Sequence, residues 1–156
     1  MSQPVTLVFV IYRYFPFGGA QRDFMRILLA CQARGFALHV FALKWEGEIP
    51  EGVTATLAPC KALSRTALYT KFSDWLSTAV KKVEGPRVIV GFSKMPGLDV
   101  YYAADPCFEE VAATQRGAYY KYTARYRHFR RFEQAVFACA SATQVLYLSP
   151  QQRKAF

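Results

Sequence analysis

Two glycines follow the first apolar run of the chain, where a strand is expected to give way to a helix. Gly18 and Gly19 come after residues 5–11, and a helical pattern spans residues 20–34. Backbone N–H groups at a helix start, together with the helix dipole, form a natural contact for a phosphate group. A tight turn that needs positive φ is the alternative explanation for the glycines. The dinucleotide-binding pattern G-x-G-x-x-G is not matched.

Charged residues also mark the expected ends of strands and starts of helices. Asp105 follows the apolar stretch V-Y-Y-A-A, where a carboxylate could orient or deprotonate a ligand hydroxyl, or could cap the next helix. Lys94 lies in G-F-S-K-M-P-G, where it could meet a phosphate or carboxylate; a solvated loop lysine is the alternative. Asp23, in the expected first helical turn, either complements the positive helix end or binds a ligand hydroxyl.

A basic and aromatic segment spans residues 116–132, and no acidic residue occurs between Glu110 and Glu133. At about 100° per residue, one side of a single helix would carry Tyr119, Tyr122, Tyr126, Phe129, Phe132 and Val136. The adjoining side would carry Arg127, Arg130 and Arg131, with Lys121 and Arg125 bordering the aromatic stripe. His128 is expected on the polar face of this helix, and His39 within a strand.

Three interpretations of this segment remain open. Inward aromatic rings with cations at the headgroups are typical of a helix at an anionic membrane surface. Single-stranded nucleic acid is a second partner, because aromatic rings stack bases and arginines bind phosphates. The third interpretation is an amphipathic core helix with a basic solvent face, since core packing needs the same stripe.

The overall composition limits the partners and the compartment. The 156 residues fit one domain, and a net charge of +9 favours nucleic acid, an anionic membrane or a phosphorylated ligand. None of the four cysteines forms a C-x-x-C pair, so a metal site is not favoured and a reducing cytoplasm fits best. No signal peptide is recognisable, and no apolar run approaches the roughly 20 residues that span a bilayer, so membrane contact would be peripheral.

Strand-like and helix-like segments alternate along the chain. Strands are expected at residues 5–11, 37–43, 53–58, 87–92, 99–104 and 143–148, and helices at 20–34, 64–84 and within 108–140. This alternation predicts an α/β fold with a Rossmann-like, doubly wound parallel sheet. Right-handed crossovers would bring the glycine loop, Lys94 and Asp105 to the same edge of the sheet. The chain stops soon after a helix start at Ser149, which suggests a domain cut from a longer protein.

Several long blocks of the sequence are similar to one family of bacterial enzymes. The blocks are Y-R-Y-F-P-F-G-G-A-Q-R-D-F-M-R-I, W-E-G, G-F-S-K-M-P-G-L-D-V-Y-Y-A-A-D and T-A-R-Y-R-H-F-R-R-F-E. They closely resemble the lipopolysaccharide core glucosyltransferase I family, and the likeness runs from the first strand almost to the last residue. The departure is Ser93, where the family pattern has asparagine.

The resemblance implies a two-domain glycosyltransferase B fold of glycosyltransferase family 4. Such an enzyme transfers glucose from UDP-glucose to a heptose of the lipopolysaccharide inner core, with retention at the anomeric carbon and without a metal or other cofactor. The acceptor lies mainly against the N-terminal domain, and the donor lies mainly in the C-terminal domain. Residues 1–156 match a single Rossmann-like acceptor-side domain. We therefore expect the donor-binding domain to be absent from this chain and the chain alone to be inactive.

The resemblance also implies roles for particular residues. The glycine loop matches the loop that approaches the donor diphosphate. Asp23 and Asp105 match acidic residues of the cleft and are the catalytic candidates, with Asp105 handling the acceptor hydroxyl. Lys94 and Arg22 are our own candidates for contact with the acceptor.

A membrane-held acceptor strengthens the membrane interpretation of the basic and aromatic segment. The expected partners are the lipopolysaccharide inner core, the anionic inner membrane and the missing C-terminal domain, with no nucleic acid. The expected location is cytoplasmic and peripheral, at the cytoplasmic face of the inner membrane. The membrane-facing candidates are Lys121, Arg125, Arg127, Arg130, Arg131, Tyr119 and Tyr120. The alternative function is a stand-alone basic and aromatic module that binds anionic membrane surfaces.

Overall fold

A six-stranded parallel sheet forms the centre of the structure, a computed structural model that describes residues 3–105 and 107–155. The strands are β1 (Thr6–Tyr14), β2 (Ala37–Trp45), β3 (Val53–Leu57), β4 (Arg87–Gly91), β5 (Val100–Tyr102) and β6 (Gln144–Leu146). The α-helices are α1 (Gly19–Ala33), α2 (Arg65–Ala79), α3 (Phe108–Gln115), α4 (Ala124–Phe137) and α5 (Pro150–Ala155). Two 3₁₀ turns, η1 (Val80–Lys82) and η2 (Ala118–Tyr122), complete the described elements. The predicted Rossmann-like α/β fold is confirmed.

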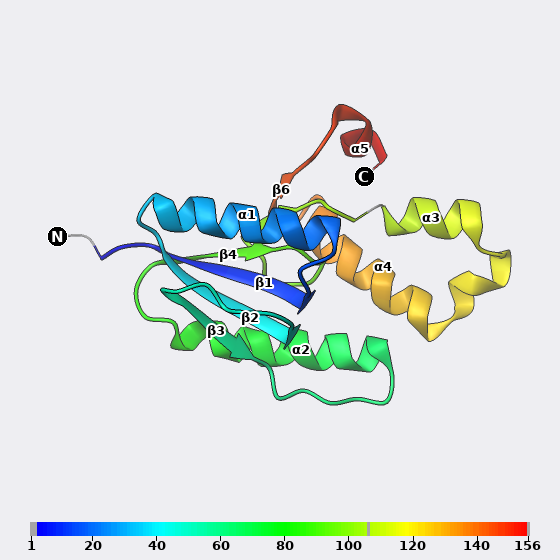
Figure 1. The fold of residues 1–156 in the computed structure, drawn as a ribbon. Helices are drawn as coiled ribbons and strands as arrows, with labels where there is room; N and C mark the ends of the chain where they lie inside the picture. Colours follow the sequence, from blue (N-terminus) through cyan, green and yellow to red (C-terminus); the bar gives the residue numbers. More distant parts are fainter. Residues whose placement is uncertain (1–2, 106, 156) are drawn as a thin grey trace.

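The strand order reverses at the middle of the sheet. The order is β3-β2-β1-β4-β5-β6, so the chain first adds strands on one side of β1 and then on the other. Figure 1 shows α1 on one face of the sheet and α2 on the opposite face. In doubly wound sheets, ligands bind at the carboxyl ends of the strands where the order reverses. A ligand site is therefore expected at the carboxyl ends of β1 and β4.

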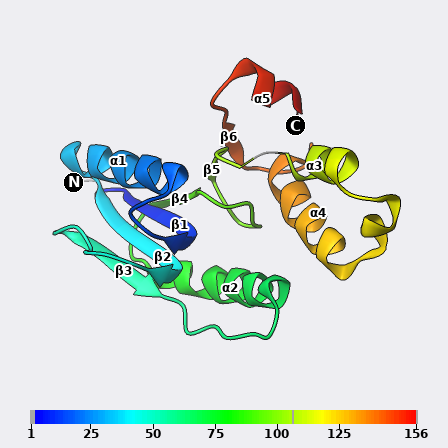
Figure 2. The same ribbon diagram turned by 45° about the vertical axis from the view of Figure 1, so that its right-hand side comes forward.

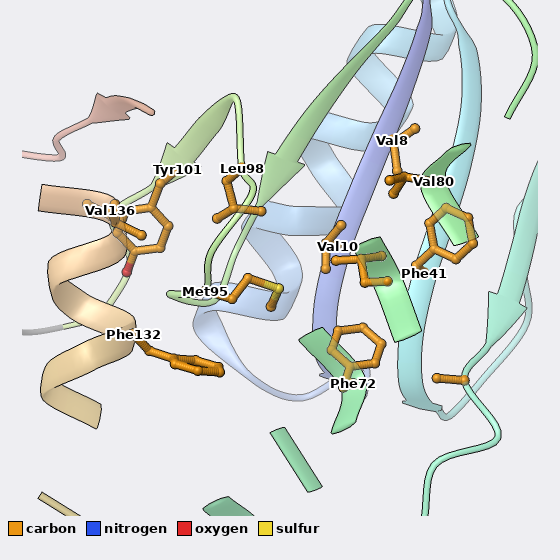
Figure 3. Packing of buried hydrophobic residues seen from close by; sticks show 13 residues of the cluster. Val8, Val10, Phe41, Phe72, Val80, Met95, Leu98, Tyr101, Phe132 and Val136 are labelled. Atoms are coloured by element: carbon orange, nitrogen blue, oxygen red, sulfur yellow. The ribbon is translucent and has the colours of Figure 1, made fainter. Parts of the chain in front are cut away.

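The central strand β1 is buried on both faces, which explains why it reads as a continuous apolar run. Successive side chains point to opposite faces of a strand. Val8 and Val10 join the cluster that contains Phe72 of α2, as Figure 3 shows. Phe9 joins the other cluster, where its ring lies 5.7 Å from that of Phe24 in α1. These two layers hold the ends of β1, α1 and α2 in place.

The segment from α3 to α4 differs from the prediction of one helix carrying an aromatic stripe from Tyr119 to Val136. The backbone is extended at Gly117 (ψ 160°) and at Thr123 (ψ 150°), and these residues separate α3, η2 and α4. The Thr123 hydroxyl accepts a hydrogen bond from the Tyr126 N–H at 3.1 Å and so caps a new helix. Figure 2 shows α4 returning from η2 beside α3. The single-helix prediction is wrong because the extended backbone and the Thr123 cap begin a separate helix, α4, after η2.

Smaller differences affect the ends of other elements. The helix expected to reach residue 84 ends at Ala79 and continues as the 3₁₀ turn η1. Ser64 does cap α2, because its hydroxyl accepts from the Ala67 N–H at 3.2 Å. Gly35, with φ of 85°, follows α1 as predicted, since this left-handed conformation favours glycine. Within the described residues, no helix is long and apolar enough to cross a membrane.

Candidate functional site

A cavity of about 640 Å³ lies at the carboxyl ends of β1 and β4, where the strand order reverses. Its walls come from those strand ends, from the starts of α1 and α2, and from α3 and α4. Its polar lining consists of Tyr12, Arg13, Gln21, Arg65, Tyr69, Ser93, Lys94, Asp105 and Arg125. Cations around a carboxylate can hold a ligand that carries both phosphate and hydroxyl groups.

Asp105 supplies the carboxylate of this cavity and lies between β5 and α3, outside regular structure. The residue as a whole is exposed, yet crowding by the cavity walls removes water from its carboxyl group. This desolvation raises the pKa of Asp105, and the charge of Lys94 partly opposes the rise. The helix-cap alternative is wrong, since the residue that precedes α3 as its N-cap is Cys107. A carboxyl group placed in this way is suited to bind or deprotonate a ligand hydroxyl.

Lys94 lines the same cavity but is not the solvated loop lysine that the sequence also allowed. Its ammonium nitrogen lies 2.6 Å from Oε2 of Glu133, and the two side chains are 11% and 6% exposed. The Tyr12 hydroxyl donates a hydrogen bond to the Lys94 carbonyl at 3.3 Å. Burial raises the pKa of Tyr12, with smaller contributions from Tyr69 and Asp105. Lys94 is therefore a fixed charge in the cavity wall.

The glycine loop at the start of α1 has ordinary backbone geometry. Gly18 has φ of −83° and Gly19 is not among the residues with positive φ, so the turn explanation is wrong. A Cβ at Gly18 would run into the side chain of Gln21, whereas a Cβ at Gly19 would meet nothing within 4 Å. Within the described parts of the chain, no side-chain hydrogen bond caps the start of this helix, and its first turn holds no acidic residue. Ala20 and Gln21 line the cavity, so this helix start is open to a ligand.

Asp23 and Arg22 do not line the cavity with Asp105. The helix begins at Gly19, which places Asp23 just beyond the first turn where it was expected. Its Oδ2 accepts a hydrogen bond from the Tyr102 hydroxyl at 3.3 Å. Arg22 is exposed on α1. Of the two candidate carboxylates, only Asp105 lines this cavity, and the catalytic role of Asp23 stays a prediction.

Sequence reasoning missed several residues of the cavity. Arg65 is the first residue of α2 and received no role, and Arg125 was assigned to a membrane surface. The Arg125 guanidinium lies over the Phe129 ring at 5.5 Å. Tyr12 and Tyr69 stack with their ring centres 3.7 Å apart. The sequence did carry a signal, because both arginines lie close behind a residue that can cap a helix. Arg65 directly follows Ser64, and Arg125 is the second residue after Thr123.

Most of the aromatic stripe of α4 faces the protein core. Tyr126, Phe132 and Val136 are 5%, 3% and 1% exposed, so the core-packing interpretation holds for this helix. Figure 3 shows Phe132 and Val136 directed toward the buried cluster. The expectation of His128 on the polar face is wrong, because it is 8% exposed and its Nδ1 lies 3.3 Å from Oγ1 of Thr70.

Within the basic and aromatic segment, the most exposed aromatic side chains lie on η2. Tyr119 and Tyr122 are 85% and 80% exposed, and Lys121 between them is also exposed. Tyr120, named as a surface candidate, is partly buried, with its ring centre 5.8 Å from that of Tyr126.

The other surface candidates are the arginines of α4. Arg127, Arg130 and Arg131 are exposed, and Arg130 pairs with Glu109 at 2.9 Å.

Metal-binding groups are not assembled in the described parts of the chain. No cluster of three or more His, Cys, Asp or Glu side chains that could hold a metal occurs among these residues. The four cysteines are free thiols.

Comparison with known proteins relates the chain to one glycosyltransferase. No family model matches the sequence. The chain is 41% identical over 146 residues to the lipopolysaccharide glucosyltransferase WaaG of Escherichia coli (strain K12), covering 94% of this chain and 39% of that protein. The crystal structure of WaaG, a glycosyltransferase involved in lipopolysaccharide biosynthesis, matches with a TM-score of 0.90 and 38% identity, over 96% of this chain and 40% of that one. The chain thus spans about two fifths of the length of these relatives.

Proposed function

Because this chain is homologous over nearly all its residues to the N-terminal part of a lipopolysaccharide glucosyltransferase, we propose that it is the acceptor-side domain of such an enzyme. The complete enzyme would transfer glucose from UDP-glucose to an inner-core heptose of lipopolysaccharide, with retention at the anomeric carbon. The observation that carries this proposal is the match at 41% identity across 94% of the chain. The position of the cavity at the strand-order reversal agrees with it.

The cavity suggests a division of roles among its residues. Asp105 binds the acceptor hydroxyl and helps to remove its proton. Lys94, Arg65 and Arg125 supply positive charge for phosphate groups of the acceptor. The open start of α1 at Gly19 receives the donor diphosphate from a second domain. No metal or other cofactor takes part in the proposed reaction.

The proposal is tested by measuring glucose transfer from UDP-glucose to truncated, heptose-ended lipopolysaccharide. The longest chain that the native gene encodes should transfer glucose, whereas this chain alone should not. In the active chain, Asp105→Asn should lower kcat by about 10²-fold or more, as expected for loss of a general base. Asp74→Asn is the matched control, because Asp74 is an exposed carboxylate on α2 outside this cavity. Absence of transfer by the long chain would sink the proposal.

The second candidate function is binding to an anionic membrane surface, favoured by the exposed rings of Tyr119 and Tyr122 beside Lys121. Rings at the interface with a neighbouring cation suit peripheral contact with anionic lipid. In the complete enzyme this contact would hold the domain at the cytoplasmic face of the inner membrane, near a lipid-linked acceptor. As a stand-alone function it would require no second domain.

A further inference from the structure

Glu133 of α4 is a carboxylate buried behind the cavity wall, with 4% of its surface exposed. Its Oε2 lies 2.6 Å from the ammonium nitrogen of Lys94 and 2.6 Å from the backbone nitrogen of Phe108. Its Oε1 accepts the Glu109 N–H at 3.1 Å and lies 3.5 Å from Sγ of Cys107. All of these neighbours are donors, so a carboxylate, which only accepts, matches the position.

These contacts hold the Lys94 side chain and the start of α3, which follows Asp105. Lys94 belongs to the loop before β5, and Phe108 begins α3 shortly after Asp105. The N-terminal side of the Asp105 segment is fixed by the sheet, where the Ala103 N–H donates to the Leu146 carbonyl at 3.0 Å. On the C-terminal side, the described residues from Cys107 onward form the start of α3, which has no cap from its own N-cap residue. The Glu133 carboxylate supplies that cap from another helix.

We propose that Glu133 is a positioning residue for the sugar-transfer reaction, which keeps Lys94 and the Asp105 segment in fixed register at the acceptor wall. The inference rests on the proposed function. Glu133 does not line the cavity, whereas Lys94, Asp105 and Phe108 do, so it acts through its partners. Holding reacting groups in place contributes strongly to rate, since a small misplacement of a catalytic group is costly.

Glu133 also controls the charge that Asp105 meets. The titratable and charged groups that line the cavity with Asp105 or interact with it are Lys94, Arg13, Arg65, Arg125, Tyr12, Tyr69 and Tyr101. Among them, Lys94 is the cation that opposes the burial-driven rise in the pKa of Asp105. The ion pair holds the Lys94 ammonium 2.6 Å from Oε2 of Glu133, so the Glu133 charge offsets part of the positive charge that Asp105 meets. Removing the Glu133 charge should therefore lower the pKa of Asp105, while removing the Lys94 charge should raise it.

The first test compares Glu133→Gln and Lys94→Met with a control, Glu110→Gln, in this chain. A glutamine at position 133 has no charge, and its amide N–H groups would face neighbours that are themselves donors. The control position, Glu110, is an exposed acid of α3. NMR would follow the Asp105 carboxyl carbon through a pH titration and the hydrogen exchange of the Phe108 amide. We expect E133Q to lower the pKa of Asp105 and to speed that exchange. K94M should raise the pKa, and E110Q should change neither.

The second test measures glucose transfer by the same variants in the longest natively encoded chain. E133Q should lower kcat about tenfold or more and leave KM for UDP-glucose unchanged, because the acceptor wall alone is displaced. The acid limb of its pH profile should move to lower pH. Equal kcat and an unchanged profile in E133Q would overturn the role of Glu133.

Two further outcomes separate this inference from the proposed function. If the unsubstituted long chain transfers no glucose, the proposed function fails, and an unchanged Asp105 titration in E133Q would overturn the positioning of Asp105 independently. If E133Q does not fold, the same two measurements on K94M, the pKa of Asp105 and kcat, test the inference instead. An unchanged Asp105 pKa together with unchanged kcat in K94M would overturn the inference.

Discussion

His128 is a buried histidine in a helix with several arginines, and only one of its ring nitrogens has a hydrogen-bond partner among the described atoms. Its Nδ1 lies 3.3 Å from Oγ1 of Thr70, and that hydroxyl already donates to the Thr66 carbonyl at 3.0 Å. The Thr70 oxygen must therefore accept, which assigns the proton to Nδ1 of a neutral imidazole. Nε2 is left without a partner among the described atoms. Burial, and then the charge of Arg131, lowers the pKa of His128.

The state of His128 predicts a loss of stability on mild acidification. Its pKa is lower in the folded than in the unfolded chain, so the unfolded chain binds more protons once the pH falls below about 6.5. The free energy of unfolding should then decrease as the pH falls through that window. His128→Gln should flatten the dependence when urea unfolding is measured between pH 7 and pH 5.

His39 provides the comparison for this measurement. Burial also lowers the pKa of His39, which bonds to Oγ1 of Thr56 at 2.9 Å, so His39→Gln should remove a separate part of the same slope. A slope that both single variants leave intact would show that neither histidine is linked to folding.

Among the helices, α4 depends on a cap that sequence periodicity does not reveal. The Thr123 hydroxyl accepts from the Tyr126 N–H at 3.1 Å, and α4 carries Phe132 into the core and Glu133 to its place behind the cavity wall. Thr123→Ala should therefore cost about 1 kcal/mol in the free energy of unfolding, measured by urea denaturation.

A matched control for the cap is Thr114→Ala in α3. The Thr114 hydroxyl donates to the Glu110 carbonyl at 2.8 Å, which the helix itself can satisfy, so its loss should cost little. Equal losses in the two variants would contradict the capping role of Thr123.

Element order was predictable, but contacts between distant elements were not. The central strands β1, β2 and β4 are largely apolar runs that turn residues bound, so the sheet and the placement of Asp105 at its edge followed from the sequence. The projection over residues 119–136 failed because it assumed one straight helix. The pairing of Lys94 with Glu133 joins residues 39 positions apart, and no spacing rule reports such a pair.

Over the whole molecule, charge is the property that the cavity and η2 share. The net charge is +9. Arg65 and Arg125 line the cavity, and Lys121 lies on η2 only a few residues before Arg125. Figure 1 places η2 at the end of the molecule away from the N-terminus, beyond the carboxyl ends of the strands. Tyr120 of η2 and Arg125 of the cavity lining also line one shared hollow, so a surface that carries anionic headgroups and meets η2 would lie near Arg125.

Binding to lipid vesicles tests this arrangement. The chain should bind vesicles that contain anionic lipid and not neutral ones, and binding should weaken as salt rises because exposed charges are screened beyond about 10 Å at 0.1 M. Lys121→Gln should weaken binding about fivefold, the equivalent of ~1 kcal/mol per basic side chain near the surface. Lys81→Gln, an exposed lysine of η1 next to the amino end of β4, should have little effect. Equal binding to neutral and anionic vesicles would contradict the electrostatic account and leave only the rings of Tyr119 and Tyr122 to explain attachment.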